Sequence, residues 1–162
     1  MDLGQFRTEI VQPTLLAITL WSSSAEELLI ATAMHESAGL TYIRQLPRAD
    51  GRQGPALGFF QIEPATAEDL VKRYIFQDKT ELGKRLRIAS QFEPWGNINE
   101  RLIGDMRFGC IIARLKYWSA PPPLPRAGDV PAMAAYWARW YNTRNDPETI
   151  QQFIANHERW LT

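Results

Sequence analysis

One apolar segment, residues 97–118, constrains the fold more than any other part of the sequence. Its apolar side chains recur at helical spacing on two adjoining sides: Ile98, Leu102, Met106, Cys110, Ala113 and Trp118 on the first, and Ile103, Ile111, Ile112 and Leu115 on the second. A helix with so broad an apolar surface can be covered only when other elements surround it. The sequence therefore predicts a central buried helix over residues 97–118.

Further helices are expected around this one. We place them at residues 23–37, 64–74, 79–92, 129–141 and 147–160, and we interpret residues 15–20 as a core helix, with a weak signal-anchor as the alternative. Two serines, Ser23 and Ser24, stand three residues before a pair of glutamates, which is the spacing of a capping box. Glu36 then lies in the last turn of that helix, and Gly39 follows as a left-handed C-cap.

Between residues 37 and 64 the pattern changes to one typical of a small β element. Residues 41–43 are β-prone, residues 47–54 are rich in turn formers, and residues 58–62 read Gly-Phe-Phe-Gln-Ile. We therefore expect a small hairpin or irregular flap beside a helical bundle, and a mostly α (α+β) fold. The proline-rich residues 121–125 predict a stiff connector, with a PxxP ligand for a protein partner as the alternative.

Composition and charge exclude several classes of protein. The chain has 162 residues, 45% of them hydrophobic, and a formal net charge of +0. We expect a single folded domain, residues 1–162, and not a disordered chain. Zero net charge argues against nucleic acid as the main partner, and no segment has the roughly 20 apolar residues of a membrane-spanning helix. The single Cys110 excludes an internal disulfide and is interpreted as a small buried hydrophobe.

The motifs of several catalytic classes are also missing. His35-Glu36 begins like the zinc-protease motif HExxH, but Gly39 stands where the second histidine would be. No GxSxG, GxGxxG or GxxxxGK[ST] motif is present, and we expect no metal and no cofactor. What remains is Glu36, at the end of an apolar helix. Apolar neighbours raise the pKa of such a carboxyl group and let it donate a proton near neutral pH, which glycosidic cleavage requires; the alternative is a solvated surface charge.

The residues after Glu36 form two recognisable motifs. Glu36-Ser37 is a Glu-Ser pair, and residues 58–66 read Gly-Phe-Phe-Gln-Ile-Glu-Pro-Ala-Thr. Together they resemble the first two motifs of the soluble lytic transglycosylase family, in which the second motif is Gly-Leu-Met-Gln-(Leu/Ile)-x-Pro-x-Thr. Gln61 follows Glu36 by 25 residues, which suits the helix and flap of that family. The resemblance implies a lysozyme-like fold and cleavage of the MurNAc–GlcNAc β-1,4 bond of peptidoglycan.

The third motif of that family, Ala-Tyr-Asn-Ala-Gly, has two partial matches. Residues 140–144 keep the Tyr-Asn pair, as Tyr141-Asn142, whereas residues 135–138 keep Ala-Tyr-x-Ala around Tyr136. The two tyrosines are five positions apart, which separates them by about 140° around a helix, so only one is expected to face the cleft. We prefer Tyr141.

The resemblance also implies roles for these residues. Glu36 would protonate the glycosidic oxygen and then take a proton from the C6 hydroxyl of the sugar, which gives a 1,6-anhydro product without water. Tyr141 would orient or stabilise the acid, and Gln61 would hold the sugar. Further residues are expected around the same cleft: Ser37, Gly58, Phe60 and Asn142.

Glu63 leaves the type of reaction open. Strand alternation would place Gln61 and Glu63 on one face, and a second carboxylate at the cleft would give a hydrolysing lysozyme, or muramidase. The alternative is that Glu63 only favours the start of the following helix. Asp50 is a further candidate for a second carboxylate.

The other aromatic and basic side chains have open interpretations. Sugar stacking would suit Tyr42 or Phe60, and one or two of Tyr136, Trp137, Trp140 and Tyr141, for which core packing is the alternative. Three other tryptophans are assigned to the core or to seams between helices: Trp21, Trp118 and Trp160. Three arginines form a solvated basic loop or contact peptide carboxylates: Arg44, Arg48 and Arg52.

The usual settings of the family suggest a bacteriophage lysis or virion-associated enzyme, or a cell-wall-opening subunit of a secretion machine. Its partners would be peptidoglycan glycan strands and the proteins of that virion or machine. It would be made in the host cytoplasm or carried in the virion, and would act on periplasmic peptidoglycan. The alternative from another class is a lysozyme-fold phage virion structural protein with weak or lost activity.

Overall fold

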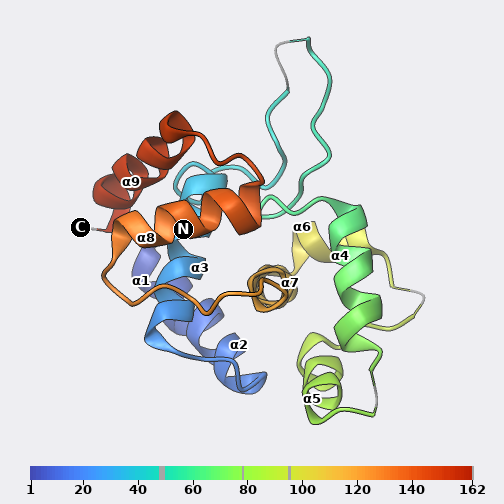
Figure 1. The fold of residues 1–162 in the computed structure, drawn as a ribbon. Helices are drawn as coiled ribbons and strands as arrows, with labels where there is room; N and C mark the ends of the chain where they lie inside the picture. Colours follow the sequence, from blue (N-terminus) through green and yellow to red (C-terminus); the bar gives the residue numbers. More distant parts are fainter. Residues whose placement is uncertain (48–49, 78, 95, 162) are drawn as a thin grey trace.

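The computed structural model describes residues 1–47, 50–77, 79–94 and 96–161, and most of this chain is helical (Figure 1). The α-helices are α1 (Leu3–Gln5), α2 (Gln12–Ala17), α3 (Ser23–Glu36), α4 (Pro64–Leu70), α5 (Glu81–Ser90), α6 (Ile98–Gly104), α7 (Met106–Trp118), α8 (Val130–Trp137) and α9 (Pro147–Leu161). Three π-helical segments join or extend them: η1 (Phe6–Val11), η2 (Val71–Ile75) and η3 (Ala138–Asn142). The prediction of a mostly α fold is confirmed.

Helix α7 lies at the centre of the molecule, and Figure 1 looks along its axis. It contacts α2, α3, α4, α5, α6, η1 and η3. Every residue from Phe108 to Leu115 is buried, so the middle of the helix has no solvent-facing side. The prediction of a central buried helix is therefore confirmed, and its apolar side chains join those of the surrounding helices in one core that includes Cys110.

The expected single helix over residues 97–118 is wrong at one point, because the chain breaks at Asp105. This residue has φ −121° and ψ 97°, and its carboxylate accepts the N–H of Phe108 at 2.9 Å. An aspartate there offers the backbone a partner other than the continuing helix and so caps a new one. Gly104 lowers the cost of the break because glycine is a poor helix former. The result is two helices, α6 and α7.

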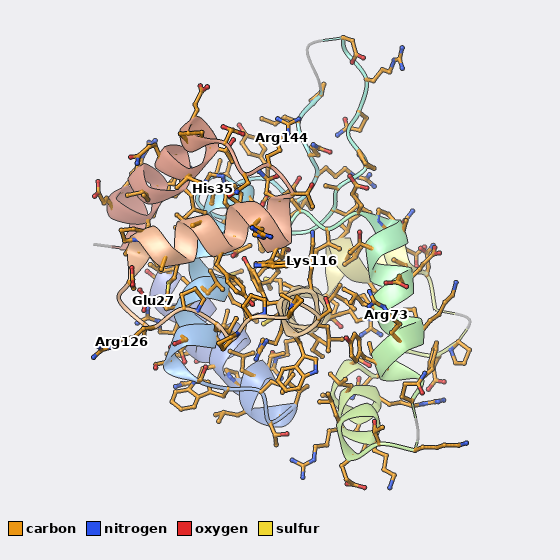
Figure 2. All side chains as sticks on the ribbon, viewed as in Figure 1. Glu27, His35, Arg73, Lys116, Arg126 and Arg144 are labelled. Atoms are coloured by element: carbon orange, nitrogen blue, oxygen red, sulfur yellow. The ribbon has the colours of Figure 1, made fainter. Side chains whose placement is uncertain are left out.

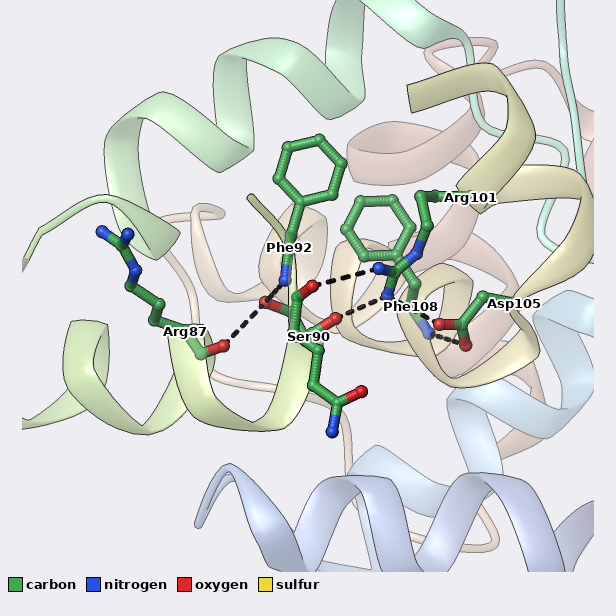
Figure 3. Close-up of polar contacts among 7 residues, drawn as sticks. Arg87, Ser90, Phe92, Arg101, Asp105 and Phe108 are labelled. Atoms are coloured by element: carbon green, nitrogen blue, oxygen red, sulfur yellow. Dashed lines mark hydrogen bonds and ion pairs between the residues drawn. The ribbon is translucent and has the colours of Figure 1, made fainter. Parts of the chain in front are cut away.

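A single guanidinium connects the helices on either side of this break (Figure 3). Arg101 on α6 donates to the carbonyls of Ser90 and Gln91 at the end of α5, and to Asp105 Oδ2 at 2.7 Å. Its Cζ lies 5.0 Å from the ring centroid of Phe108 on α7. Arg101 therefore ties α5, α6 and α7 together through both its charge and its flat face.

The N-terminal residues form a helical arm that the sequence predicts only in part. α1, η1 and α2 follow one another without a gap, and Leu15 and Ile18 are fully buried. The core helix expected at residues 15–20 begins much earlier and ends at Ala17. It cannot continue because Thr19 has φ 57°, in the left-handed region.

The other helices occur where the sequence predicts them, with small shifts at their ends. α3 is capped by Ser22, whose side chain accepts the N–H of Ala25, and not by Ser23 or Ser24 as expected. α4 with η2, α5, α8 with η3, and α9 fill the expected ranges. Within the described ranges, no helix has both the length and the apolarity needed to cross a membrane.

Residues 41–47 and 50–63 belong to an extended loop that rises from the helical body, drawn in turquoise in Figure 1. The expected β-hairpin is wrong for the described part of this loop, which has only two isolated bridges, from Leu57 to Arg44 and to Ile62. A ladder does not continue because the backbone turns sharply after Leu57, where Gly58 has φ 72° and Gln61 has φ 44°. The described part of the loop is otherwise irregular and contains no strand.

Two tryptophans correct the expected core. Trp21 is 45% exposed and Trp118 is 47% exposed, so neither lies in the core or in a seam between helices. Each has a polar neighbour: Trp21 Nε1 donates to Glu26 Oε2 at 2.7 Å, and the Trp118 ring centroid lies 5.4 Å from Cζ of the buried Arg114. The proline-rich connector between α7 and α8 is not helical, as expected.

Candidate active site

A cleft of about 650 Å³ opens where the end of α3, the loop, the start of α4, η3 and α7 meet. Its lining includes His35 and Glu36 from α3, Gln61 and Glu63 from the loop, Thr66 from α4, Lys116 from α7, and Tyr141 and Asn142 from η3. A volume of this size is typical of ligand-binding clefts. The structure thus brings together several of the side chains that the sequence singled out.

Glu36 is the last residue of α3, and the helix carries its carboxyl group to the floor of the cleft. The indole Nε1 of Trp137 donates to Glu36 Oε1 at 3.0 Å. Burial raises the pKa of Glu36 from 4.5 to about 7, against the opposing effects of the Trp137 hydrogen bond and the Lys116 charge. The carboxyl group can therefore both give and take a proton near neutral pH.

His35 lies beside this carboxyl group but cannot act as a cation there. Burial lowers the pKa of His35 to about 4, so its ring is neutral at pH 7. The ring packs against Trp137, with centroids 4.4 Å apart, and against Phe153, at 5.2 Å. Its Nδ1 lies 3.0 Å from Asn156 Nδ2 on α9. His35 and its aromatic neighbours thus fix the Trp137 ring that holds Glu36.

Tyr141 takes a different place from the one expected. It lines the cleft, but its hydroxyl donates to the backbone carbonyl of Phe60 at 2.7 Å, so it connects η3 to the loop. Burial raises the pKa of Tyr141 well above its usual value, so the hydroxyl keeps its proton. Trp137, and not Tyr141, makes the hydrogen bond to Glu36. The sequence singled out Trp137 only as a packing or stacking residue.

The other tyrosine of the pair lies away from the cleft. Tyr136 donates from its hydroxyl to the carbonyl of Pro122, at 2.9 Å, and lines a separate groove. Asn142 and Gln61 both line the cleft. Gln61 Nε2 donates one of its two hydrogens to the carbonyl of Gly58 at 2.8 Å, which leaves the amide oxygen and the second N–H to bind a ligand.

Three expected cleft residues have structural roles instead. Ser37 is fully buried, donates from Oγ to the carbonyl of Ala33 at 2.6 Å and accepts the N–H of Leu40, so it closes the end of α3. Phe60 is 2% exposed and points into the core, with its ring 6.2 Å from that of Phe6. Gly58 is buried against α6 and provides the sharp turn of the loop. The three residues are close in sequence to residues of the cleft, but none of them lines it.

Lys116 is a cleft residue that the sequence analysis missed. Its Nζ lies 4.1 Å from the ring centroid of Tyr141, and its charge interacts with Glu36 and Glu63. Figure 2 shows it in the middle of the molecule, at the end of α8 that continues into η3. Burial lowers the pKa of Lys116, while the two carboxylates oppose that effect. Lys116 is one of three cations in α7, with Arg107 and Arg114, and no feature of the sequence separates it from the other two.

The remaining candidates divide between the cleft and the surface. Glu63 is exposed at the rim and starts α4 without a side-chain cap. Tyr42 and Arg44 also line the cleft. Asp50 pairs with Arg52 at 3.5 Å in the outer part of the loop. Arg48 lies outside the described residues.

The described residues contain no group of three or more His, Cys, Asp or Glu side chains that could hold a metal ion. Cys110 is buried, and burial raises the pKa of its thiol to about 12, as fits the buried hydrophobe expected. Comparison with protein-family models, with curated proteins and with solved structures found no match to this chain.

Proposed function

We propose that this protein cleaves the MurNAc–GlcNAc β-1,4 bond of peptidoglycan as a lytic transglycosylase, with Glu36 as acid and base. The observation that carries the proposal is a carboxyl group with a pKa of about 7 at the floor of an open cleft. Such a group can protonate a leaving oxygen as an oxocarbenium-like state forms. Peptidoglycan is proposed as the substrate because the two motifs around Glu36 and Gln61 resemble those of the soluble lytic transglycosylase family.

The residues around Glu36 fit the two steps of this reaction. The Trp137 hydrogen bond fixes one carboxyl oxygen and leaves the other to face the glycosidic oxygen. After protonation of the leaving group, the charge of Lys116 stabilises the carboxylate that remains. That carboxylate then takes the proton of the attacking C6 hydroxyl, and the amide oxygen of Gln61 holds the sugar.

A hydrolytic muramidase is the second candidate, and one observation favours it. Glu63 lines the same cleft as Glu36, and both carboxylates interact with Lys116. A carboxylate at the rim could position a water molecule in place of the C6 hydroxyl. The setting, a phage lysis or virion-associated enzyme or a secretion-machine subunit, and action on periplasmic peptidoglycan, follow from the resemblance and are part of the proposal.

Digestion of purified peptidoglycan tests the proposal, with mass spectrometry of the released muropeptides. The wild type should release 1,6-anhydro products, and Glu36→Gln should lower the rate on the order of 10³-fold, because a general acid contributes about that much. Glu68→Gln, an exposed carboxylate of α4, is the matched control and should keep full activity.

The outcomes separate the alternatives. Products with a reducing end would favour the muramidase and overturn the transglycosylase. An inactive wild type would favour a virion structural protein, and an active Glu36→Gln would remove Glu36 from the mechanism. The rate of the wild type should also fall as the pH rises through about 7, where Glu36 loses its proton.

A further inference from the structure

A second groove, of about 560 Å³, lies away from the cleft, where the end of α7 meets the proline-rich connector and the start of α3. Its walls include Trp118, Tyr117 and Tyr136, and the connector prolines Pro121 to Pro123. The Tyr136 hydroxyl donates to the carbonyl of Pro122 at 2.9 Å, which fixes the connector against α8. The groove is therefore a formed surface with aromatic and apolar walls.

Arg114 lines this groove and is only 6% exposed. Its Nε donates to the carbonyl of Leu20 at 3.2 Å, but its Nη1 is buried and has no hydrogen-bond acceptor among the described residues. None of the ion pairs found within the described chain includes Arg114. Burial lowers the pKa of Arg114, and the groups that oppose this effect are Tyr136 and Cys110, neither of them a carboxylate.

A buried guanidinium without a carboxylate is costly, since most buried charges are paired. Arg101 also has one buried nitrogen without a partner, its Nε, but its guanidinium is paired with the carboxylate of Asp105 and donates to two backbone carbonyls. Arg114 has one backbone carbonyl as an acceptor but no carboxylate, and its Nη1 has no partner among the described residues. The arrangement suits an anion that arrives from outside.

Two neighbours of Arg114 favour the same kind of ligand. The first turn of α3 is at the edge of the groove through Ser22 and Ser24, and the N-terminus of a 14-residue helix favours negative charge. The ring of Trp118 lies with its centroid 5.4 Å from the guanidinium Cζ and is itself 47% exposed, so an aromatic surface for a ligand lies next to the charge. The carboxylates of that first turn have other partners: Glu26 binds Trp21 and Arg7, and Glu27 binds the N–H of Gly128.

We propose that this groove binds a carboxylate carried on an apolar body, such as an N-acylated amino acid or the C-terminal residue of a peptide. The two oxygens of a carboxylate match the fork of a guanidinium. The apolar body of the ligand lies against Trp118 and the proline wall, which gives contacts that a bare inorganic anion lacks. The proposal does not depend on peptidoglycan cleavage by the cleft.

Binding is measured by titration calorimetry and by the NMR signal of the Trp118 indole N–H, assigned with Trp118→Phe. The probes are N-acetyl-leucine, its neutral analogue N-acetyl-leucinamide, inorganic phosphate, and an N-acetylated Ala-Ala-Leu tripeptide. N-acetyl-leucine should bind and shift the Trp118 signal, while the amide and phosphate should bind at least about tenfold more weakly. The tripeptide distinguishes the sources: tighter binding assigns the groove to a chain end, and equal binding assigns it to a free acyl amino acid.

Variants locate the site. Arg114→Leu should abolish binding of N-acetyl-leucine, and Arg114→Lys should weaken it, because a lysine keeps the charge but not the fork. Arg126→Leu is the matched control: Arg126 is an exposed residue of the same connector that points away from the molecule, and its loss should change nothing (Figure 2). Equal affinity for N-acetyl-leucine and its amide would overturn the proposal, and so would binding that shifts other signals but not that of Trp118. The comparison of acid and amide uses the wild type, so it remains decisive even where an Arg114 variant does not fold.

Discussion

Glu36 and Glu63 line the same cleft, but the floor that holds Glu36 and the rim that holds Glu63 have different surroundings. Glu36 ends a helix that is buried from Leu28 to Met34, and an indole N–H from α8 reaches one of its oxygens. Glu63 lies at the end of an irregular loop and is exposed to solvent. The floor is built from core side chains, whereas the rim depends on the backbone of a single loop.

The difference shows how one residue type can have two roles within one cavity. Removing a carboxyl group from water raises its pKa, so the group keeps its proton closer to neutral pH. Of the two glutamates, only Glu36 is in that position, and burial is the largest cause of its raised pKa. The proton donor of the cleft is therefore determined by packing around the end of α3, and not by the number of carboxylates in the cleft.

The largest expected effect concerns the free energy of unfolding that the protein loses when Glu36, on the floor of the cleft, ionises. The pKa of Glu36 is about 7 in the folded chain and 4.5 as the ordinary value, so the folded state binds the proton more tightly. The stabilising contribution of protonated Glu36 is complete below pH 4.5 and is lost as the pH rises through about 7. Glu36→Gln lacks this dependence. The free energy of unfolding of Glu36→Gln, minus that of the wild type, should therefore be about 3 kcal/mol higher at pH 8 than at pH 4.

Urea unfolding of both proteins between pH 4 and pH 8 measures this difference. Glu68→Gln removes an exposed carboxylate of α4 and should follow the wild type at every pH. Parallel curves for Glu36→Gln and the wild type would mean that Glu36 is not held in a buried environment.

The next effect concerns the attachment of the rim. Gly58 has φ 72°, and a Cβ added there would lie 2.3 Å from the carbonyl oxygen of Leu102 on α6. Gly58→Ala should therefore destabilise the fold by about 2 kcal/mol or more, through both the left-handed backbone and the overlap. Gly51 is the matched control, since it has φ 77° but nothing within 4 Å of an added Cβ.

Thermal unfolding compares the two alanine variants. Gly51→Ala should cost only the backbone part, about 1 kcal/mol. If the two variants lose the same stability, the contact between the loop and α6 does not hold the rim in place.

The third effect concerns the cation between floor and rim. Lys116 lowers the pKa of Glu36, so its removal should let Glu36 keep its proton to higher pH. If the chain cleaves glycans as proposed, the fall in the rate of cleavage near pH 7 should move upward in Lys116→Met by up to about one pH unit. Lys116→Arg keeps the charge and should leave the profile in place, as should Lys72→Met, which removes an exposed lysine from η2. An unchanged profile in Lys116→Met would show that this cation does not act on Glu36.

The sequence predicts the floor better than the rim, and the reason is physical. The position of Glu36 follows largely from local rules, because a capping serine and a run of helix formers determine where α3 begins and how far it runs. The details differ from the expectation: the N-cap is Ser22, and Ala38 is the first left-handed residue after the helix, one position before Gly39. The burial of α7 follows from its apolar breadth in the same way. These properties depend on residues that are close together in the chain, so they can be predicted from a single sequence.

The rest depends on contacts between distant segments. The sequence gives no indication that the Tyr141 hydroxyl donates to the Phe60 carbonyl, or that Trp137 reaches Glu36 from 101 residues away. Alternation predicts a hairpin near Gly58, but the positive φ values of Gly58 and Gln61 turn the chain too sharply for strands. Such partners are determined only when the helices pack.

The smallest expected effect separates the two carboxylates directly. Glu63 is exposed at the rim and has no side-chain cap on α4, so Glu63→Gln should change the stability by less than about 0.5 kcal/mol. If the chain is a transglycosylase, the variant should also keep the rate of glycan cleavage within about twofold and still release anhydro products, because the C6 hydroxyl needs no second base. Muropeptide analysis of Glu63→Gln beside Glu36→Gln measures both. A loss on the order of 10²-fold in Glu63→Gln would give the rim a catalytic role and favour hydrolysis by a carboxylate pair, because a second group in proton transfer contributes about that much.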